Sequence, residues 1–426
     1  MSPISFIKSV YPQKIEHWIM MSVLLYTISS VLQGFVSPFF SKIILYVGCI
    51  VYLKQLITKW KGIPLSGITR LFFIFLLLWT IALTIHMLFF FDLSSTISGE
   101  INRGFISYVS YLFDSLPFFP HLLVLCFCCF KKGYEFDFRY FIRVSLLMAI
   151  IYVVVFPFAF QKMTSIDVRY IGDIVDGVNQ GKDATLGLRI LVPATILVYL
   201  KQYIPLNQWK LFVLVFICSL LINAYMGRRG ATAFNVLYIL SMWLLYVTHK
   251  GKGSNRFTIF IIGILMLGIA YTIFINTSDS FFSYILERGM DDNRSDRNID
   301  LIVDMTANGD WLWGRGWFGQ YYDSVYGYRG SIEPGALALI LRGGFLYLIP
   351  YVAILLFTFI NGLFRSNNIL CKSFGILAGL QILYLYPYGW PMFSMDFLML
   401  WIGVYYCNQH YFRDQDDETV FNKYFA

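Results

Sequence analysis

Arginines are the side chains of this sequence whose type and position most clearly suggest chemistry. Arg228 and Arg229 stand together in "GRRG" between two long apolar runs, and Arg342 lies inside another apolar run. A guanidinium group presents a planar fork of hydrogen-bond donors that matches phosphate and carboxylate oxygens. The pattern indicates binding of an anionic group beside apolar surroundings, although Arg228 and Arg229 could also simply reach lipid headgroup phosphates.

Glu333 is the candidate proton acceptor. It precedes the apolar run that contains Arg342, in "IEPGALALILRGGFLYL". Nine residues of helix extend roughly 13 Å at 1.5 Å per residue, so we expect Arg342 to lie below the membrane surface, facing protein or a cavity. A carboxylate at the edge of an apolar cavity has a raised pKa and could act as a general base. Glu333 could instead only cap the helix, with Pro334 in its first turn.

An aromatic stretch lies before Glu333 and reads "DWLWGRGWFGQYYDSVYGY" over residues 310–328. Aromatic faces stack on the apolar faces of sugars, so Trp313, Trp317 and Tyr328 are candidate glycan contacts. Arg315, between them, is a further candidate for binding an anion. The same rings could instead form an aromatic belt at the membrane interface.

Two long polar loops, residues 161–185 and 276–335, hold further acids and arginines. In the second loop, the alternation in "ERGMDDNRSDRNID" favours an amphipathic surface helix laced with ion pairs over a binding site. Arg169 and Arg189 bracket aspartates whose spacing does not match a calcium loop. We therefore predict no metal and no cofactor, and we treat Arg169 and Arg189 as candidate substrate contacts.

Membrane helices are the elements that must position these residues. The chain has 426 residues, of which 58% are hydrophobic and 14% are charged, and its mean hydropathy is +0.63. These values indicate an integral membrane protein. The formal net charge of +8 comes from short basic clusters between apolar runs, so no nucleic-acid partner is predicted. The seven cysteines lie in or near apolar runs and predict no disulfide framework.

Apolar runs of roughly 20 residues predict about twelve membrane-spanning helices in one all-α polytopic domain that covers residues 1–426. The predicted helices lie near residues 17–35, 38–57, 70–91, 105–130, 140–160, 186–204, 208–225, 230–248, 257–275, 336–360, 369–388 and 392–408.

The distribution of lysine and arginine predicts the orientation of these helices. Every second connection is basic, including Lys8 and Lys14 before the first helix and Lys131 and Lys132 after the fourth. These connections and both termini are therefore predicted to be cytoplasmic, with "RDQDDETVF" as a solvated tail. The two long loops then face the periplasm in a bacterium. The "GRRG" pair lies on that same side, against the usual charge bias.

Two motifs resemble the O-antigen polymerase and ligase superfamily of bacterial envelope glycosyltransferases. They are Arg229 with Gly230 at the start of a helix, and Glu333 followed by "LALILRGGFLYL". The resemblance includes the many helices and the two large periplasmic loops, and it implies a GT-C-like fold. "RYIGDIVDGVNQG" is also loosely similar to an Arg/Gly/Asn pattern of the family. Ligases of the superfamily carry His-Asn where Glu333 and Pro334 stand, so the chain is more similar to the polymerases.

The resemblance implies a glycosyltransferase of the bacterial inner membrane. It would join oligosaccharide repeat units carried on undecaprenyl pyrophosphate into O-antigen or into a capsular or exopolysaccharide, without a metal. A chain-length regulator and a flippase would be its protein partners, within membrane lipid. The implied catalytic residues are Glu333 and Arg229, and the implied substrate contacts are Arg228, Arg342, Arg189, Arg169 and Arg315. The alternatives are a ligase of the same superfamily and a flippase or other transporter of lipid-linked oligosaccharides.

Overall fold

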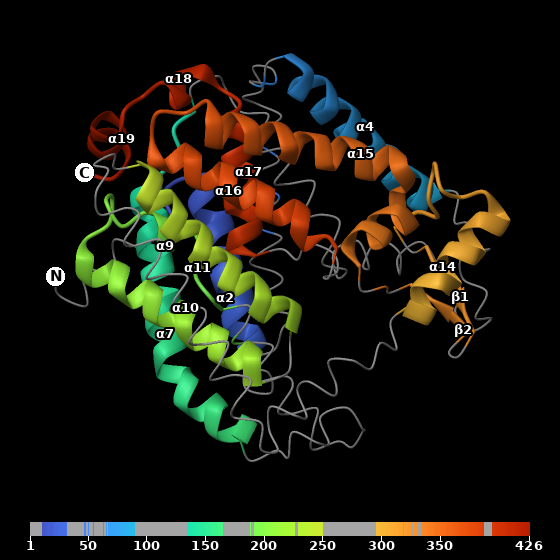
Figure 1. Ribbon diagram of the computed structural model, residues 1–426, viewed down its shortest axis with the longest axis horizontal. Helices are drawn as coiled ribbons and strands as arrows, with labels where there is room; N and C mark the ends of the chain where they lie inside the picture. Colours follow the sequence, from blue (N-terminus) through green and yellow to red (C-terminus); the bar gives the residue numbers. More distant parts are fainter. Residues whose placement is uncertain are drawn as a thin grey trace.

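Helices and a short hairpin make up the described part of the computed structural model (Figure 1). The structure describes residues 11–31, 67–89, 134–164, 191–225, 229–249, 295–317, 319–324, 327–330, 334–386 and 394–426, with single positions at 47, 50, 54, 63, 65, 188 and 332. The elements are α2 (Ile15–Val31), α4 (Gly67–Phe89), α7 (Phe138–Thr164), α9 (Ile196–Tyr199), α10 (Leu206–Tyr225), α11 (Arg229–His249), α14 (Ser295–Asn308), β1 (Tyr321–Asp323), β2 (Gly327–Arg329), α15 (Gly335–Phe364), α16 (Ile369–Tyr384), α17 (Met395–Cys407), α18 (His410–Arg413) and α19 (Asp417–Tyr424).

Four of the described helices, α4, α7, α10 and α15, are long and apolar enough to cross a membrane. Three more, α11, α16 and α17, are apolar but shorter. Leu71 and Leu78 of α4 and Val154 of α7 are exposed, as expected where a helix meets lipid. The chain therefore has the mostly helical architecture of a membrane protein.

The described helices lie within a few residues of eight of the predicted runs. These helices are α2, α4, α7, α10, α11, α15, α16 and α17. The runs predicted near 38–57, 105–130 and 257–275 lie outside the described residues apart from single positions, as does the predicted loop 161–185 beyond Thr164.

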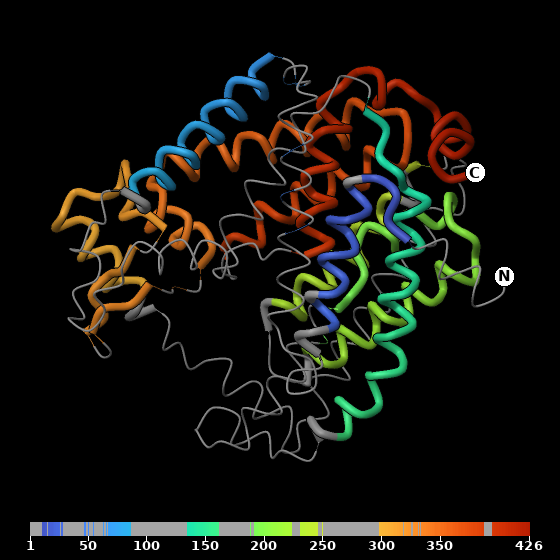
Figure 2. Tube along the Cα trace, turned by 180° about the vertical axis from the view of Figure 1, so that it is seen from behind, coloured from blue at the N-terminus to red at the C-terminus, as the bar shows by residue number. Residues whose placement is uncertain are grey.

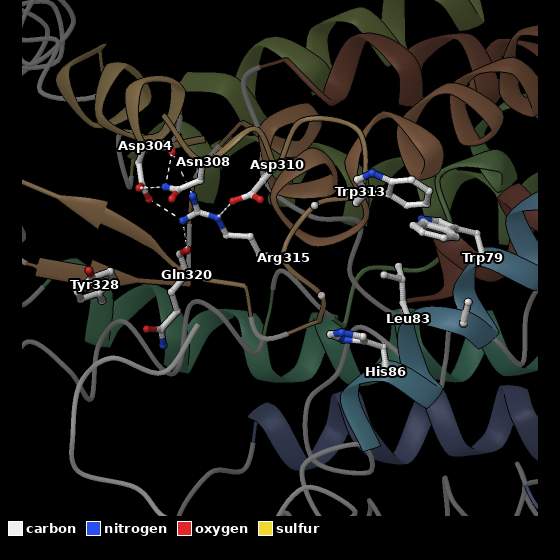
Figure 3. A pocket seen from close by; sticks show the side chains of 13 residues that line it. Trp79, Leu83, His86, Asp304, Asn308, Asp310, Trp313, Arg315, Gln320 and Tyr328 are labelled. Atoms are coloured by element: carbon white, nitrogen blue, oxygen red, sulfur yellow. Dashed lines mark hydrogen bonds and ion pairs between the residues drawn. The ribbon is translucent and has the colours of Figure 1, made fainter. Parts of the chain in front are cut away.

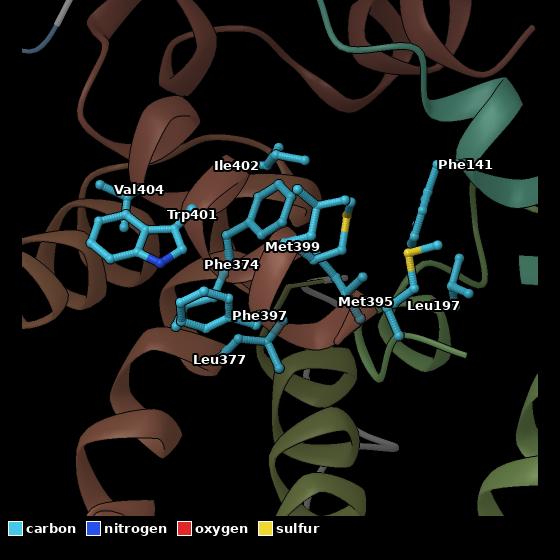
Figure 4. Packing of buried hydrophobic residues seen from close by; sticks show 14 of the residues in the cluster. Phe141, Leu197, Phe374, Leu377, Met395, Phe397, Met399, Trp401, Ile402 and Val404 are labelled. Carbon is cyan, nitrogen blue, oxygen red and sulfur yellow. The ribbon is translucent and has the colours of Figure 1, made fainter. Parts of the chain in front are cut away.

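Helix α15 is the longest described helix, and α4, α16 and α17 pack around it (Figures 1 and 2). Trp401 of α17 lies in this core and is 1% exposed. Its ring meets Phe73 of α4 edge-on at 6.4 Å and Tyr351 of α15 at 6.2 Å between centroids. Figure 4 shows the adjacent apolar packing of Trp401, Phe374 and Phe397. Edge-to-face ring contacts add to the area that the rings bury, so this cluster fixes α17 against its neighbours.

The helix predicted over 186–204 is wrong for its described residues 191–204. Leu191 and residues 193–200 are buried, but only Ile196–Tyr199 form a short helix, with bends and turns on either side. A carboxylate at the start of α17 explains how this irregular backbone is accommodated. Asp396 of α17 accepts hydrogen bonds from the Thr195 backbone nitrogen at 2.6 Å and from its hydroxyl at 3.0 Å. Irregular backbone among membrane helices needs such protein partners, which the apolar pattern of the sequence does not reveal.

The C-terminal tail is folded and docked, although its acids Asp414, Asp416 and Glu418 are exposed as predicted for a solvated end. Val420 and Tyr424 of α19 are buried. The side chain of Asn368, which caps α16, donates to the carbonyls of Phe412 at 2.8 Å and Gln415 at 3.0 Å. The acidic composition suggested solvation, whereas these contacts dock the tail on the start of α16.

Asp417 is the acid that fastens α19 to the helices. It accepts hydrogen bonds from His249 Nε2 at 2.6 Å, from the Tyr203 hydroxyl, and from the Ile369 backbone nitrogen at 2.9 Å. Lys372 Nζ lies 3.1 Å from His249 Nδ1, which must accept this bond, so Nε2 carries the proton donated to Asp417. Partial burial acts to raise the pKa of Asp417, but the hydrogen bonds from His249 and Tyr203 lower it well below its ordinary value.

A second polar cluster lies at the same end of the molecule. Asp137 accepts hydrogen bonds from His17 Nε2 and Lys14 Nζ, both at 3.2 Å, and from the Tyr140 backbone nitrogen at 3.0 Å. The His17 hydrogen bond is the main reason why the pKa of Asp137 lies well below its ordinary value, although burial opposes the shift. The ion pair between Lys423 and Glu135 joins α19 to this cluster.

Candidate functional site

A compact polar unit covers the start of α15, at the end of the molecule away from the C-terminal tail (Figures 1 and 2). We call it the capping segment; it comprises residues 295–317, 319–324 and 327–330. Helix α14 is amphipathic and buries Leu301 and Met305 against Leu341 of α15. It overlaps the predicted amphipathic stretch 287–300 only from Ser295 on, and residues 287–294 lie outside the described residues. Strands β1 and β2 pair antiparallel, with Tyr321 opposite Arg329. The predicted polar loop is therefore an ordered helix and hairpin over the described positions.

Helix α15 is broken at Gly344 within the run that predicted a continuous helix. Gly344 has φ 65° and ψ −169°, a conformation available essentially only to glycine. Such a break releases the backbone groups that the helix would otherwise pair internally.

The loop 311–316 of the capping segment satisfies these released groups. The backbone nitrogens of Arg315 and Gly316 donate to the carbonyls of Leu341 at 2.7 Å and Arg342 at 2.8 Å. In the opposite direction, Phe345 N donates to the carbonyl of Trp311 at 2.9 Å. The break and the capping segment therefore form one hydrogen-bonded unit.

Trp79 of α4 joins the same unit. Its Nε1 donates to the Gly343 carbonyl at 2.8 Å, and its ring lies 5.6 Å from that of Trp313 between centroids. Helix α4, which is far away in the sequence, thus meets the capping segment and α15 at the break.

Arg315 holds the capping segment together. Its Nε bonds Asp310 at 2.7 Å, and its Nη1 bonds Asp304 at 2.6 Å and the Gln320 carbonyl at 2.7 Å. Burial acts to lower the pKa of Arg315, but the hydrogen bonds to Asp304 and Asp310 raise it above its ordinary value. These ion pairs join α14 to the following loop, and they lie outside the stretch 287–300 in which ion pairs were predicted. Substrate binding by Arg315 stays a prediction, because these bonds already occupy much of the guanidinium.

A cavity of about 520 Å³ opens between the capping segment and the end of α4 (Figure 3). Trp79, Leu83 and His86 line it from α4, and the Arg315 cluster faces them from the capping segment. The lining combines aromatic rings with carboxylate, amide and guanidinium groups. Such a surface can stack on an apolar ring face and accept hydrogen bonds from hydroxyl groups.

The three aromatic candidates have different environments. Trp313 is 57% exposed and Tyr328 is 39% exposed, and both line the cavity. Trp317 is 8% exposed and packs edge-on against Tyr347 of α15 at 5.9 Å between centroids. The geometry therefore suits Trp313 and Tyr328 for contact with a ligand, and Trp317 for anchoring the segment to α15.

Arg342 lies about two turns into α15, two residues before the break at Gly344. Its Nη1 is 3.2 Å from the Ala338 carbonyl, and its Nη2 is 3.4 Å from the Gly330 carbonyl of the capping segment. The latter contact ties the guanidinium to the end of the hairpin. These contacts show that the guanidinium faces protein, and its depth below the membrane surface stays a prediction.

The side chains of the remaining candidate residues lie outside the described part of the structure. Arg229 is the first residue of α11, and the structure describes only its backbone. The candidates that lie outside the described residues are Glu333, Arg228, Arg189 and Arg169. Their roles stay predictions.

Sequence reasoning missed Trp79 and His86, which sit in the apolar run of α4. Trp79, Leu83 and His86 are spaced four and three residues apart, which places them on one face of a helix. A histidine on the same face as a tryptophan was the available signal. It was hidden by the hydrophobicity of the run, which reads as a lipid-facing helix.

No three His, Cys, Asp or Glu side chains among the described residues converge in a way that could hold a metal ion. Comparisons with known families, with curated proteins and with solved structures find no significant match to this chain. Its function is therefore inferred from its own residues and their geometry.

Proposed function

We propose that this protein is a membrane glycosyltransferase that polymerises oligosaccharide repeat units linked to undecaprenyl pyrophosphate. The observation that carries the proposal is the cavity of aromatic and acceptor groups that the capping segment forms beside the break in α15. Arg342 lies at the same break, so a site suited to a glycan lies close to a guanidinium suited to a phosphate. The sequence motifs around Arg229 and Glu333 support the same reaction.

The distribution of charge supports placing the capping segment on the periplasmic side of a bacterial inner membrane. Lys14 and Lys372 lie in the clusters at the opposite end, where the folded C-terminal tail also lies (Figure 1). By the positive-inside rule this basic end faces the cytoplasm. The capping segment then faces the side on which a flippase delivers lipid-linked repeat units.

The proposed reaction is a displacement at an anomeric carbon. A hydroxyl oxygen of the acceptor repeat unit forms a bond to the anomeric carbon of the donor chain, whose bond to the pyrophosphate oxygen breaks. Glu333 takes the proton of the hydroxyl, and undecaprenyl pyrophosphate leaves with the electron pair. Arg342, Arg229 and Arg228 stabilise the charge that develops on the leaving group, with Arg189 and Arg169 as further contacts.

A flippase or other transporter is the second candidate, and the irregular segment 191–205 favours it. Interrupted helices near the middle of the membrane are common at transporter binding sites. In this chain, however, Asp396 is hydrogen-bonded to Thr195, and residues 193–200 of the segment lie buried in protein. A ligase is disfavoured because Glu333 stands where ligases carry histidine.

Complementation in the parent strain tests the proposal. The gene is deleted, plasmids restore the wild type, Glu333→Gln, Arg229→Ala or Arg342→Ala, and surface polysaccharide is separated on a gel. We expect the deletion to leave one repeat unit on the acceptor, the wild type to restore the ladder and the three variants to fail. Arg365→Ala, an exposed arginine at the opposite end of α15, is the control and should restore the ladder. Loss of even the single-unit band in the deletion strain would contradict a polymerase.

A further inference from the structure

The cavity is large enough for a sugar residue, and the Trp313 ring, which contacts Trp79, lines it. Its volume of about 520 Å³ falls in the range of roughly 300–1,000 Å³ typical of small-ligand sites. Trp313 presents an exposed ring, and Trp79 lies behind it at 5.6 Å and an angle of 48°. The hydrogen bond from Trp79 to the Gly343 carbonyl holds its ring in place beside Trp313. A pyranose ring can place its C–H face against the exposed Trp313 ring.

The polar side of the cavity is rich in hydrogen-bond acceptors. Asp304, Asn308, Asp310 and Gln320 all line it. Both hydrogen bonds of the Asn308 amide nitrogen go to Asp304, so the amide oxygen keeps its acceptor capacity. The side-chain oxygen of Gln320 is buried and has no hydrogen-bond partner among the described residues. Groups that donate hydrogen bonds, such as hydroxyls and amines, complement this surface.

The charge of the cavity disfavours anions. Two carboxylates, Asp304 and Asp310, surround the single guanidinium of Arg315. Asp304, Asp310 and Arg315 together therefore carry one net negative charge. An acidic sugar or a pyrophosphate would meet this charge in a partly enclosed space, where electrostatic repulsion is weakly screened.

We propose that the cavity is a saccharide subsite that selects an uncharged or amino-bearing sugar and rejects pyrophosphate. Trp313 stacks on the sugar ring, while Gln320, Asn308 and Asp310 accept hydrogen bonds from its hydroxyl or amino groups. Because the ligand is taken to be part of the glycan chain, the assignment rests on the proposed function. The pyrophosphate then binds elsewhere, at Arg342 and the arginines near the start of α11.

Direct binding to the purified full-length protein in lipid nanodiscs tests this subsite without requiring turnover. Saturation-transfer NMR and titration calorimetry would be run with a panel of neutral, amino-bearing and uronate-containing bacterial oligosaccharides, and with sodium pyrophosphate. We expect only the neutral and amino-bearing oligosaccharides to bind in this cavity. Trp313→Ala should weaken that binding about tenfold, the size of one aromatic contact. Trp313→Phe should keep most of it, and Tyr386→Ala, an exposed tyrosine outside the cavity lining, should leave it unchanged.

A change of charge provides a gain-of-function test. Asn308 is exposed at the end of α14, where a lysine is compatible with the helix. Asn308→Lys should remove the net negative charge and allow a uronate-containing oligosaccharide to bind, while Asn308→Gln should not.

Three results would overturn the subsite. The first is that no oligosaccharide of the panel binds. The second is that pyrophosphate binds and that its binding depends on Trp313. The third is that Trp313→Ala leaves sugar binding unchanged. The last result would assign Trp313 to the membrane interface. If sugars bind through Trp313 while the complementation test fails, the saccharide subsite is confirmed and the proposed polymerase function is contradicted. If polymerisation is confirmed but sugar binding does not depend on Trp313, only the proposed saccharide subsite is contradicted.

Discussion

Gly314 of the capping segment crosses Gly344 of α15 so closely that neither position has room for a side chain. A Cβ atom on Gly314 would lie 2.5 Å from the backbone nitrogen of Gly344, and one on Gly344 would overlap the carbonyl of Leu312. Both glycines also have positive φ angles, 71° and 65°. The two backbones can therefore exchange hydrogen bonds directly, which makes the break in α15 part of the wall that supports the cavity.

Gly314→Ala should destabilise the protein and release the capping segment. A positive φ alone costs about 1–2 kcal/mol for alanine, and the overlap with α15 adds to it. Gly309→Ala is the matched control, because Gly309 also has a positive φ but nothing lies within 4 Å of its Cβ position. Thermal unfolding in detergent would compare the two. Equal losses for both variants would contradict the close crossing.

Arg315→Lys should loosen the capping segment although it keeps the charge. A lysine cannot reproduce the bonds from Nε to Asp310 and from Nη1 to Asp304, so a loss of about 2 kcal/mol is expected. Limited proteolysis should then cut within residues 295–330 faster than in the wild type. Arg365→Lys, at an exposed arginine, is the control and should leave the cleavage rate unchanged. A cleavage rate for Arg315→Lys that equals the wild type would show that the cluster does not hold the segment.

Trp79→Phe should separate the hydrogen bond that Trp79 donates to Gly343 from its ring contact with Trp313. Phenylalanine keeps an aromatic ring beside Trp313 but cannot donate to the Gly343 carbonyl, so about 1 kcal/mol of stability should be lost. Trp243→Phe, in α11 and outside the cavity lining, is the comparison for the general loss of an indole. Unfolding midpoints would be measured for both. A Trp79→Phe protein as stable as the wild type would mean that the hydrogen bond contributes nothing.

The docking of α19 should weaken in acid. The pKa of Asp417 is lower in the folded protein than its ordinary value, so protonation favours the undocked state. Its contribution is fully present above the ordinary aspartate pKa of about 4 and is lost as the pH falls through the folded-state value. Asp417→Asn should remove this contribution at neutral pH and flatten the acid limb of the stability profile. Glu418→Gln, at the exposed neighbouring acid, should not. An acid limb that persists unchanged in Asp417→Asn would assign it to other groups.

The long helices were predictable because hydrophobicity over a membrane thickness dominates their sequences. The break at Gly344 was not, since "LRGGFLYL" reads as apolar helix and the hydrogen bonds that stabilise the break come from residues 311–316. The folded tail was missed for a similar reason. The acids near Asp417 look solvated until His249 and Tyr203, far away in the sequence, are brought to them.

The candidate site was predictable in its composition rather than in its geometry. Trp313, Arg315 and Tyr328 were named from the residue types, and they do line one cavity. Which of these residues can contact a ligand and which hold the structure together depends on contacts with residues elsewhere in the sequence. Arg315 is committed to Asp304 and Asp310, and Trp317 is buried against Tyr347. Trp79 and His86 could be added only once α4 was seen to lie beside the capping segment.

Reconstitution of the purified protein in liposomes tests the central claim most directly. The liposomes would contain undecaprenyl pyrophosphate carrying the repeat unit of the parent strain, and products would be separated by length while released undecaprenyl pyrophosphate is quantified. The account predicts a ladder of lengthening chains, with one undecaprenyl pyrophosphate released per unit added, and loss of both products in Glu333→Gln and Arg342→Ala. Movement of the intact lipid-linked unit across the bilayer, without any new glycosidic bond, would contradict it and favour a transporter.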